Sequence, residues 1–133
     1  MISFDTNVVV RLLVDDDAVQ CERASRAFRQ AVADGGVFVS ATVLVEVVWV
    51  LPSRVQKDRA TIVAALRRLV ASEGVTVEHD AWVGRAIAAY EAGPADFSDY
   101  FILESSREAN ALPVLTFDER FARSANVQEV PSA

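Results

Sequence analysis

Four acidic side chains follow or flank the short apolar segments of this chain. Carboxylate oxygens are the ligands that hard divalent cations such as Mg²⁺ and Mn²⁺ prefer in proteins. The four are Asp5 in ISFDTN, Glu46 in ATVLVEVVWVL, Asp99 in DFSDYFI and Asp118 in LTFDER. Each comes just after a run typical of a β-strand, or lies in a helical pattern next to one. Together they predict a metal site, provided that folding brings them to one place.

Glu46 is the most informative of the four, because it is the only charged residue in its run ATVLVEVVWVL. Such an apolar segment predicts burial, and a buried ionised carboxylate is costly unless a positive group meets it. The run contains no Lys or Arg, so we expect a metal ion beside Glu46. The alternative is an ion pair with a distant Arg. We also expect Trp49, Val50 and Leu51 of the same run to lie in the core.

An aspartate at a strand-to-helix turn often serves only as an N-cap that accepts backbone hydrogen bonds. Asp5, Asp99 and Asp118 each fit that alternative. Asp96 and Ser98 compete with Asp99 for the cap of one helix, which leaves Asp99 for another role. For the metal hypothesis to be wrong, several unrelated explanations would have to coincide at one edge of the sheet.

The chemistry of such a carboxylate cluster points to phosphodiester hydrolysis. Carboxylates packed together repel one another, and one or two Mg²⁺ or Mn²⁺ ions remove that repulsion. The ions also lower the pKa of bound water and stabilise charge on a phosphodiester. Asp5 and Asp99 are the expected direct ligands, while Glu46 and Asp118 bind directly, through water, or help deprotonate the nucleophile. The residues expected to hold these acids in place are Thr6, Asn7, Asp96, Ser98 and Thr116.

Short β-like runs alternate with longer helical patterns along the chain. Strands are predicted at residues 2–4, 37–40, 75–77 and 113–116, with an edge strand at 127–130. Helices are predicted at residues 6–14, 18–34, 41–51, 58–72, 80–92, 98–111 and 118–123. Ser40 is a candidate cap for the helix at 41–51, and Pro52 is expected to end it. The periodicity of that segment alone leaves a strand open, but its length favours a helix.

This alternation indicates an α/β protein with a mostly parallel sheet of about five strands, covered by helices on both faces. In such sheets ligands bind outside the carboxyl ends of the strands, so we expect the four acids on one rim. The 133 residues, 52% of them hydrophobic, fit one globular domain over residues 1–133. No apolar run approaches the roughly 20 residues that span a bilayer. Asp5 and Asn7 interrupt any signal peptide, so we expect a soluble, cytoplasmic protein.

The remaining composition narrows the chemistry further. Cys21 and His79 are the only residues of their types, which excludes an internal disulfide and disfavours zinc, Ser–His and Cys–His sites. The net charge of −6 counts mildly against tight RNA binding. Almost all basic residues are arginine, however, and arginine suits bidentate phosphate contacts. Arg11 and Arg54 are candidate RNA contacts, with a solvated surface role as the alternative.

The motifs DTN after a first strand, the Glu inside an apolar helix running into WVL, DFSD, and LTFDERF resemble the PIN-domain ribonucleases. Within that family the chain is most similar to the toxins of VapBC toxin–antitoxin pairs, from Asp5 to about Phe121. The resemblance implies a three-layer α/β/α fold in a single PIN-like nuclease domain and metal-dependent cleavage of RNA. It also implies a homodimer and an antitoxin that inhibits by covering the acidic groove.

One departure from the family pattern is DYFI, where the family often has Ala-Leu after the acid. Tyr100 and Phe101 are bulkier, and we expect them to alter the wall of the groove and therefore substrate preference. The leading hypothesis is a metal-dependent endoribonuclease that acts as the toxin of a type II toxin–antitoxin pair. The alternative is a non-catalytic PIN-like regulatory or binding module that works through a protein partner. Acids at all four positions count against that alternative.

Overall fold

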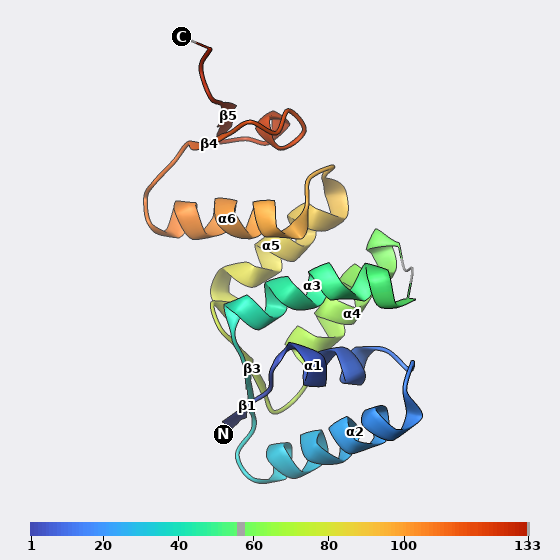
Figure 1. Cartoon of the computed structure of the whole chain (residues 1–133). Helices are drawn as coiled ribbons and strands as arrows, with labels where there is room; N and C mark the ends of the chain where they lie inside the picture. Colours follow the sequence, from blue (N-terminus) through green and yellow to red (C-terminus); the bar gives the residue numbers. More distant parts are fainter. Residues whose placement is uncertain (56–57, 133) are drawn as a thin grey trace. The chain divides into compact units, whose positions relative to one another are not determined.

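The structure is a computed structural model that describes the backbone of residues 1–55 and 58–132, and their side chains except those of 53–55. The chain forms two compact units, Met1–Asp80 and Ala81–Ala133 (Figure 1). The two units are described one after the other.

In the residues that the structure describes, the first unit contains three strands and four helices. They are β1 (Ile2–Ser3), α1 (Thr6–Leu13), α2 (Ala18–Ala33), β2 (Val37–Val39), α3 (Ala41–Val55), α4 (Arg59–Ala71) and β3 (Val75–Val77). The second unit begins at Ala81, the second residue of α5. Its elements are α5 (Asp80–Ala92), α6 (Phe97–Glu108), β4 (Val114–Thr116), the 3₁₀ helix η1 (Phe121–Arg123) and β5 (Val127–Glu129).

All the strand pairs in the described residues are parallel. In the first unit the order is β1-β2-β3, with Ile2 opposite Val37 and Val37 opposite Val75. In the second unit β4 pairs with β5, with Val114 opposite Val127. The α/β class and the five parallel strands are therefore confirmed. They form a three-stranded and a two-stranded sheet instead of the one sheet expected, because each strand pairs within its own unit.

Helix α1 lies between α2 and α3, and α4 packs on β3 (Figure 1). These contacts bury the apolar positions that recur at helical spacing, as expected for amphipathic helices. Val9 and Val10 of α1 and Leu66 of α4 are at most 1% exposed. Aliphatic side chains thus form the core of this unit.

The start of α3 is tied to the end of β3. The hydroxyl of Ser40 accepts a hydrogen bond from the Val43 amide at 3.2 Å, which confirms Ser40 as the N-cap. Glu78, directly after β3, accepts a hydrogen bond from the Ala41 amide at 2.8 Å through Oε1. A carboxylate is favourable here because the N-terminus of a helix carries partial positive charge.

The end of α3 differs from the prediction. The helix continues through Pro52 to Val55, so the proline does not end it. A proline inside a helix removes the hydrogen bond that its own amide would donate, and its ring crowds the carbonyl four residues earlier. Leu51, which is 2% exposed, anchors the turn before Pro52 in the core. The helix therefore continues for a further turn despite the proline.

Aromatic rings join α5 to α6 in the second unit. Trp82 meets Phe101 edge to face with ring centres 4.8 Å apart, and Phe97 meets Tyr90 and Phe101 with ring centres 5.7 Å apart. Such edge-to-face pairs add to the stabilisation from burial alone. None of the helices in the described residues has the length and hydropathy needed to cross a bilayer.

Glu104 is the buried charged residue of the second unit, with a side chain only 8% exposed. Its Oε2 accepts a hydrogen bond from Nε of Arg85 at 3.0 Å and lies 3.4 Å from Nε of Arg107. The two arginines come from different helices, α5 and α6. Their charges compensate the carboxylate and link the two helices at this position.

Candidate functional site

Asp99 lies in the first turn of α6, where Asp96 is the N-cap residue. The amide of Asp96 donates a hydrogen bond to Oδ2 of Asp99 at 3.2 Å, as in a capping box. Of the two residues expected to compete with Asp99 for the cap, Asp96 takes the N-cap position. Asp99 is not freed from capping as expected, because its side chain accepts the Asp96 amide. Ser98 is half-buried in the same turn.

The carboxyl group of Asp99 has a pKa raised above its ordinary value. Burial contributes most to this rise in the pKa, because it disfavours the charged form. The negative charges of Asp96 and Asp118 raise it further, whereas the amide of Asp96 and the charge of Arg120 act in the opposite direction. Asp99 therefore lies among carboxylates whose repulsion a cation would relieve.

Asp118 occupies the turn between β4 and η1. Its Oδ1 accepts hydrogen bonds from the amides of Arg120 at 2.8 Å and Phe121 at 3.2 Å. The hydroxyl of Thr116 in turn accepts a hydrogen bond from the Asp118 amide at 3.0 Å. The helix expected at 118–123 is shorter, Phe121–Arg123, because the side chain of Asp118 closes a turn before the helical residues begin.

Asp5 follows β1 in the first unit and is the N-cap of α1. Its Oδ1 accepts a hydrogen bond from the Val8 amide at 3.1 Å, and the residue is exposed. Thr6, half-buried, and Asn7, exposed, form the first turn of the same helix. The capping role proposed as the alternative for Asp5 is thus present.

These backbone contacts leave the three aspartates capable of binding a cation. Each uses one oxygen for neighbouring amides, namely Oδ1 of Asp5, Oδ2 of Asp99 and Oδ1 of Asp118. A carboxylate has two oxygens and about four acceptor positions, so capping and metal binding are compatible. The capping bonds also hold each carboxylate in a defined orientation.

Glu46 does not occupy the buried position expected for it. It is exposed on α3, on the same side as Thr42 and Trp49, and Trp49 is itself 77% exposed. The buried face of the helix consists of Leu44, Val47, Val48 and Leu51. A helix turns about once every 3.6 residues, so one packed face leaves the other outside even in a uniformly apolar run. The burial argument for a metal at Glu46 was therefore wrong, as was core placement of Trp49.

The predicted acids thus fall into two groups, with Asp5 and Glu46 in the first unit and Asp99 and Asp118 in the second. The structure brings Asp96, Asp99 and Asp118 near enough for their charges to interact. Within the residues that the structure describes, no group of three or more His, Cys, Asp or Glu side chains is arranged to hold a metal ion. The Asp99–Asp118 pair nevertheless fits a hard cation in donor type and in charge.

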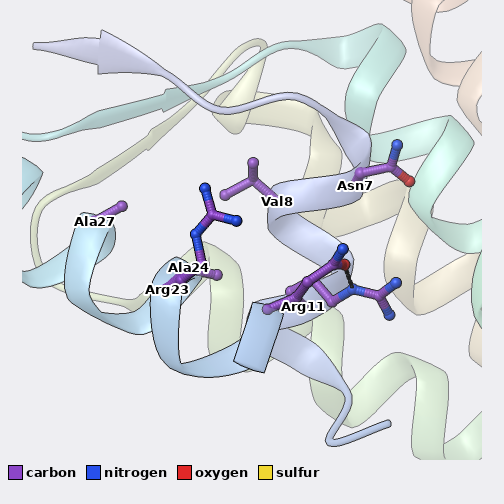
Figure 2. A pocket seen from close by; sticks show the side chains of 7 residues that line it. Asn7, Val8, Arg11, Arg23, Ala24 and Ala27 are labelled. Atoms are coloured by element: carbon purple, nitrogen blue, oxygen red, sulfur yellow. Dashed lines mark hydrogen bonds between the residues drawn. The ribbon is translucent and has the colours of Figure 1, made fainter. Parts of the chain in front are cut away.

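Arg11, a candidate RNA contact, lines a cavity of about 290 Å³ between α1 and α2, which Asn7 also borders (Figure 2). Its guanidinium is occupied within the protein. Nη1 pairs with Oδ1 of Asp16 at 2.6 Å, and Nε donates to Oε1 of Gln20 at 2.6 Å. These partners reduce the positive charge available to a phosphate. The side chain of Arg54, the other candidate, lies outside the described residues.

Tyr100 and Phe101 were expected to form a groove wall, and Tyr100 does not. Tyr100 is only 3% exposed, and Phe101 is half-buried against Trp82 and Phe97. Tyr100 packs on Phe121, while Phe101 packs on Trp82 and Phe97 and remains partly exposed. Tyr100 is therefore too deeply buried to form such a wall itself.

Arg120 is a residue near the acids that sequence reasoning missed. Its positive charge lowers the pKa of Asp99, and its amide binds Asp118. The available signal was its position two residues after Asp118 in LTFDER.

Comparison with protein families gives a match over almost the whole chain. The family model described as the PIN domain matches residues 2–127, which include parts of both units. No curated protein matches the chain.

Proposed function

The chain belongs to the PIN-domain family, and from this premise we propose that it is a metal-dependent endoribonuclease, the toxin of a VapBC-type toxin–antitoxin pair. Family membership supports a nuclease-type hydrolase that acts on RNA. The observation that carries the proposal is the position of Asp99 in the first turn of α6, bonded to the Asp96 amide, where burial first and then the negative charges of Asp96 and Asp118 raise its pKa. A crowded set of carboxylates is unfavourable by itself and becomes favourable when a cation binds. Residues 1–133 would act as one nuclease domain.

In this proposal Asp5 and Asp99 are direct ligands of one or two Mg²⁺ or Mn²⁺ ions. Glu46 and Asp118 bind directly, through water, or help deprotonate the nucleophile. Bound ions would lower the pKa of a water molecule and stabilise charge on the phosphodiester. The polar residues assigned to hold the acids are Thr6, Asn7, Asp96, Ser98 and Thr116.

The contacts of the second unit suggest how the chain prepares these acids. The amides of Arg120 and Phe121 both donate to Oδ1 of Asp118, and the Thr116 hydroxyl accepts from the backbone amide of Asp118 and so fixes the start of this turn. The Asp96 amide holds that of Asp99. Carboxylates held in advance lose less conformational entropy when a ligand arrives, which strengthens binding. Arg120 limits the accumulated negative charge and so keeps Asp99 more readily ionised.

Removal of divalent cations tests this proposal. We expect a mixed pool of tRNA and ribosomal RNA to be cut with Mg²⁺ or Mn²⁺ and to remain intact with EDTA, because the carboxylates alone cannot activate water. Gel analysis of the fragments measures this, and excess Mn²⁺ added after EDTA should restore cleavage. Cleavage that persists in EDTA would contradict metal dependence. Cleavage of no RNA, together with tight binding of a protein partner, would favour the non-catalytic binding module.

The partners form a second part of the proposal. We expect the isolated chain to be a homodimer in the cytoplasm and to bind an antitoxin that brings a basic side chain to the acidic groove. Light scattering after gel filtration should show twice the mass of one chain, and a larger complex after co-expression with the antitoxin. The complex should cleave RNA at least about tenfold more slowly, since a cation from the partner competes for the carboxylates. A monomer that is harmless to cells at high expression would contradict this part.

A further inference from the structure

The hydroxyl of Tyr100 contacts the turn that carries Asp96 and Asp99. This oxygen accepts a hydrogen bond from the Ala95 amide at 3.2 Å. Ala95 is 2% exposed and directly precedes Asp96, whose own amide donates to Oδ2 of Asp99. The Tyr100 hydroxyl is therefore connected to the carboxylate of Asp99 by two hydrogen bonds, made by the amides of the adjacent residues Ala95 and Asp96.

Gly93 provides the space that this hydroxyl occupies. A Cβ atom built on Gly93 would overlap the hydroxyl of Tyr100 and would lie 3.0 Å from the carbonyl oxygen of Ala89. The Gly93 amide already donates to that carbonyl at 2.8 Å, at the end of α5. Any larger residue at position 93 must displace the hydroxyl or the turn. The hydroxyl position therefore depends on glycine at position 93.

The ring of Tyr100 contacts the second acid-bearing turn. It meets Phe121 edge to face, with ring centres 6.2 Å apart at an angle of 85°. Phe121 is 2% exposed, and its amide donates to Oδ1 of Asp118. A movement of the Phe121 backbone would therefore shift an amide that orients Asp118.

We propose that Tyr100 is a positioning residue that sets the arrangement of Asp99 and Asp118 for the cation of the proposed nuclease site. Its hydroxyl holds the turn before Asp99, and its ring packs on the residue that orients Asp118. One rigid side chain thereby links two turns that are about twenty positions apart in the sequence. The inference rests on the proposed function, because it assigns the two carboxylates to a metal.

The test is Mn²⁺ binding by Tyr100→Phe, measured by calorimetry and by the broadening of amide NMR signals. This variant keeps the ring against Phe121 and removes the acceptor of the Ala95 amide. We expect the Kd for Mn²⁺ to rise about tenfold, the change typical of a lost supporting contact at a metal site. We also expect faster hydrogen exchange at Ala95 and Asp96, with little change in melting temperature.

Tyr90→Phe is the matched control, because Tyr90 is the other tyrosine of the second unit and is also buried at 7% exposure. Its Kd for Mn²⁺ should equal that of the wild type. Gly93→Ala is a second route to the same effect, since it displaces the hydroxyl without changing Tyr100. It should weaken Mn²⁺ binding as Tyr100→Phe does, and the two changes combined should be less than additive.

The outcomes separate this inference from the proposed function. A folded Tyr100→Phe protein with unchanged Mn²⁺ affinity would overturn the positioning role, as would an equal loss in Tyr90→Phe. A wild-type protein that binds Mn²⁺ but cleaves no RNA would overturn the nuclease proposal, while the titration would still decide the role of Tyr100. A wild-type protein that binds no Mn²⁺ would overturn both.

Discussion

The Asp99→Asn protein is expected to lose metal-dependent RNA cleavage and yet to unfold at a higher temperature than the wild type at neutral pH in EDTA. The loss of activity should exceed about a hundredfold, since the variant removes a proposed ligand and not only a supporting contact. The gain in stability follows from the surroundings of Asp99. Burial and the charges of Asp96 and Asp118 disfavour its ionised form, as its raised pKa indicates.

The pH dependence of stability gives this prediction its sign. A carboxyl group whose pKa is higher in the folded state binds its proton more tightly there than in the unfolded chain. The free energy of unfolding therefore falls as the pH rises from the ordinary pKa of 3.8 through the raised pKa of folded Asp99. Asparagine carries no charge, and its side-chain oxygen can still accept the amide of Asp96. The variant should gain most above this range and nothing below it.

Melting temperatures in EDTA between pH 3 and pH 8 test this expectation. Asp15→Asn is the control, because it removes one negative charge from an exposed position outside both acid-bearing turns. Addition of Mn²⁺ should stabilise the wild type and Asp15→Asn but not Asp99→Asn. An Asp99→Asn protein that melts lower than the wild type at neutral pH would show that the carboxylate is stabilising in the absence of metal. Full RNA cleavage by the variant would refute its role as a ligand.

Replacement of both Arg85 and Arg107 by glutamine is expected to lower the free energy of unfolding by about 3 kcal/mol. The change leaves the carboxylate of Glu104, whose side chain is 8% exposed, without the two charges that compensate it. Removing the exposed arginines is costly because the charge of Glu104 remains buried, where water cannot solvate it. Glu104→Gln should cost only about 1 kcal/mol, because the arginines, 55% and 42% exposed, remain hydrated.

A matched control exists on the surface of α2, where Glu22 lies near Arg26 and Arg29 at 3.5 and 3.9 Å. All three side chains are more than half exposed, so Arg26→Gln with Arg29→Gln should cost less than about 1 kcal/mol. Urea denaturation of the two double variants measures the difference. Equal losses for the buried and exposed groups would contradict the argument from burial. RNA cleavage should be unchanged in the folded fraction of both.

The elements of the fold were predictable from local patterns. The alternation of short β-branched runs with amphipathic segments placed every described strand and helix, because hydrophobic period and turn residues act over neighbouring positions. Capping was predictable for the same reason, as Ser40 before α3 and Asp96 before α6 show. The C-terminal end of α3 was not predicted correctly, because the helix continues beyond Pro52 while Leu51 is packed in the core. The tendency of a proline to end a helix is overcome here because the burial of the neighbouring Leu51 stabilises the helix more.

The sequence by itself also determined the kind of chemistry, because the types and order of Asp5, Glu46, Asp99 and Asp118 carry the resemblance to a nuclease family. Only the tertiary structure decided what surrounds each acid. It put Glu46 on the outer face of α3, where it needs no buried cation, and set Asp99 beside Asp118 with its pKa raised. The sequence of α3 is apolar on all sides of the helix, so it does not specify which face packs against the core. Burial and charge repulsion depend on residues distant in the chain, so they appear only when the chain is folded.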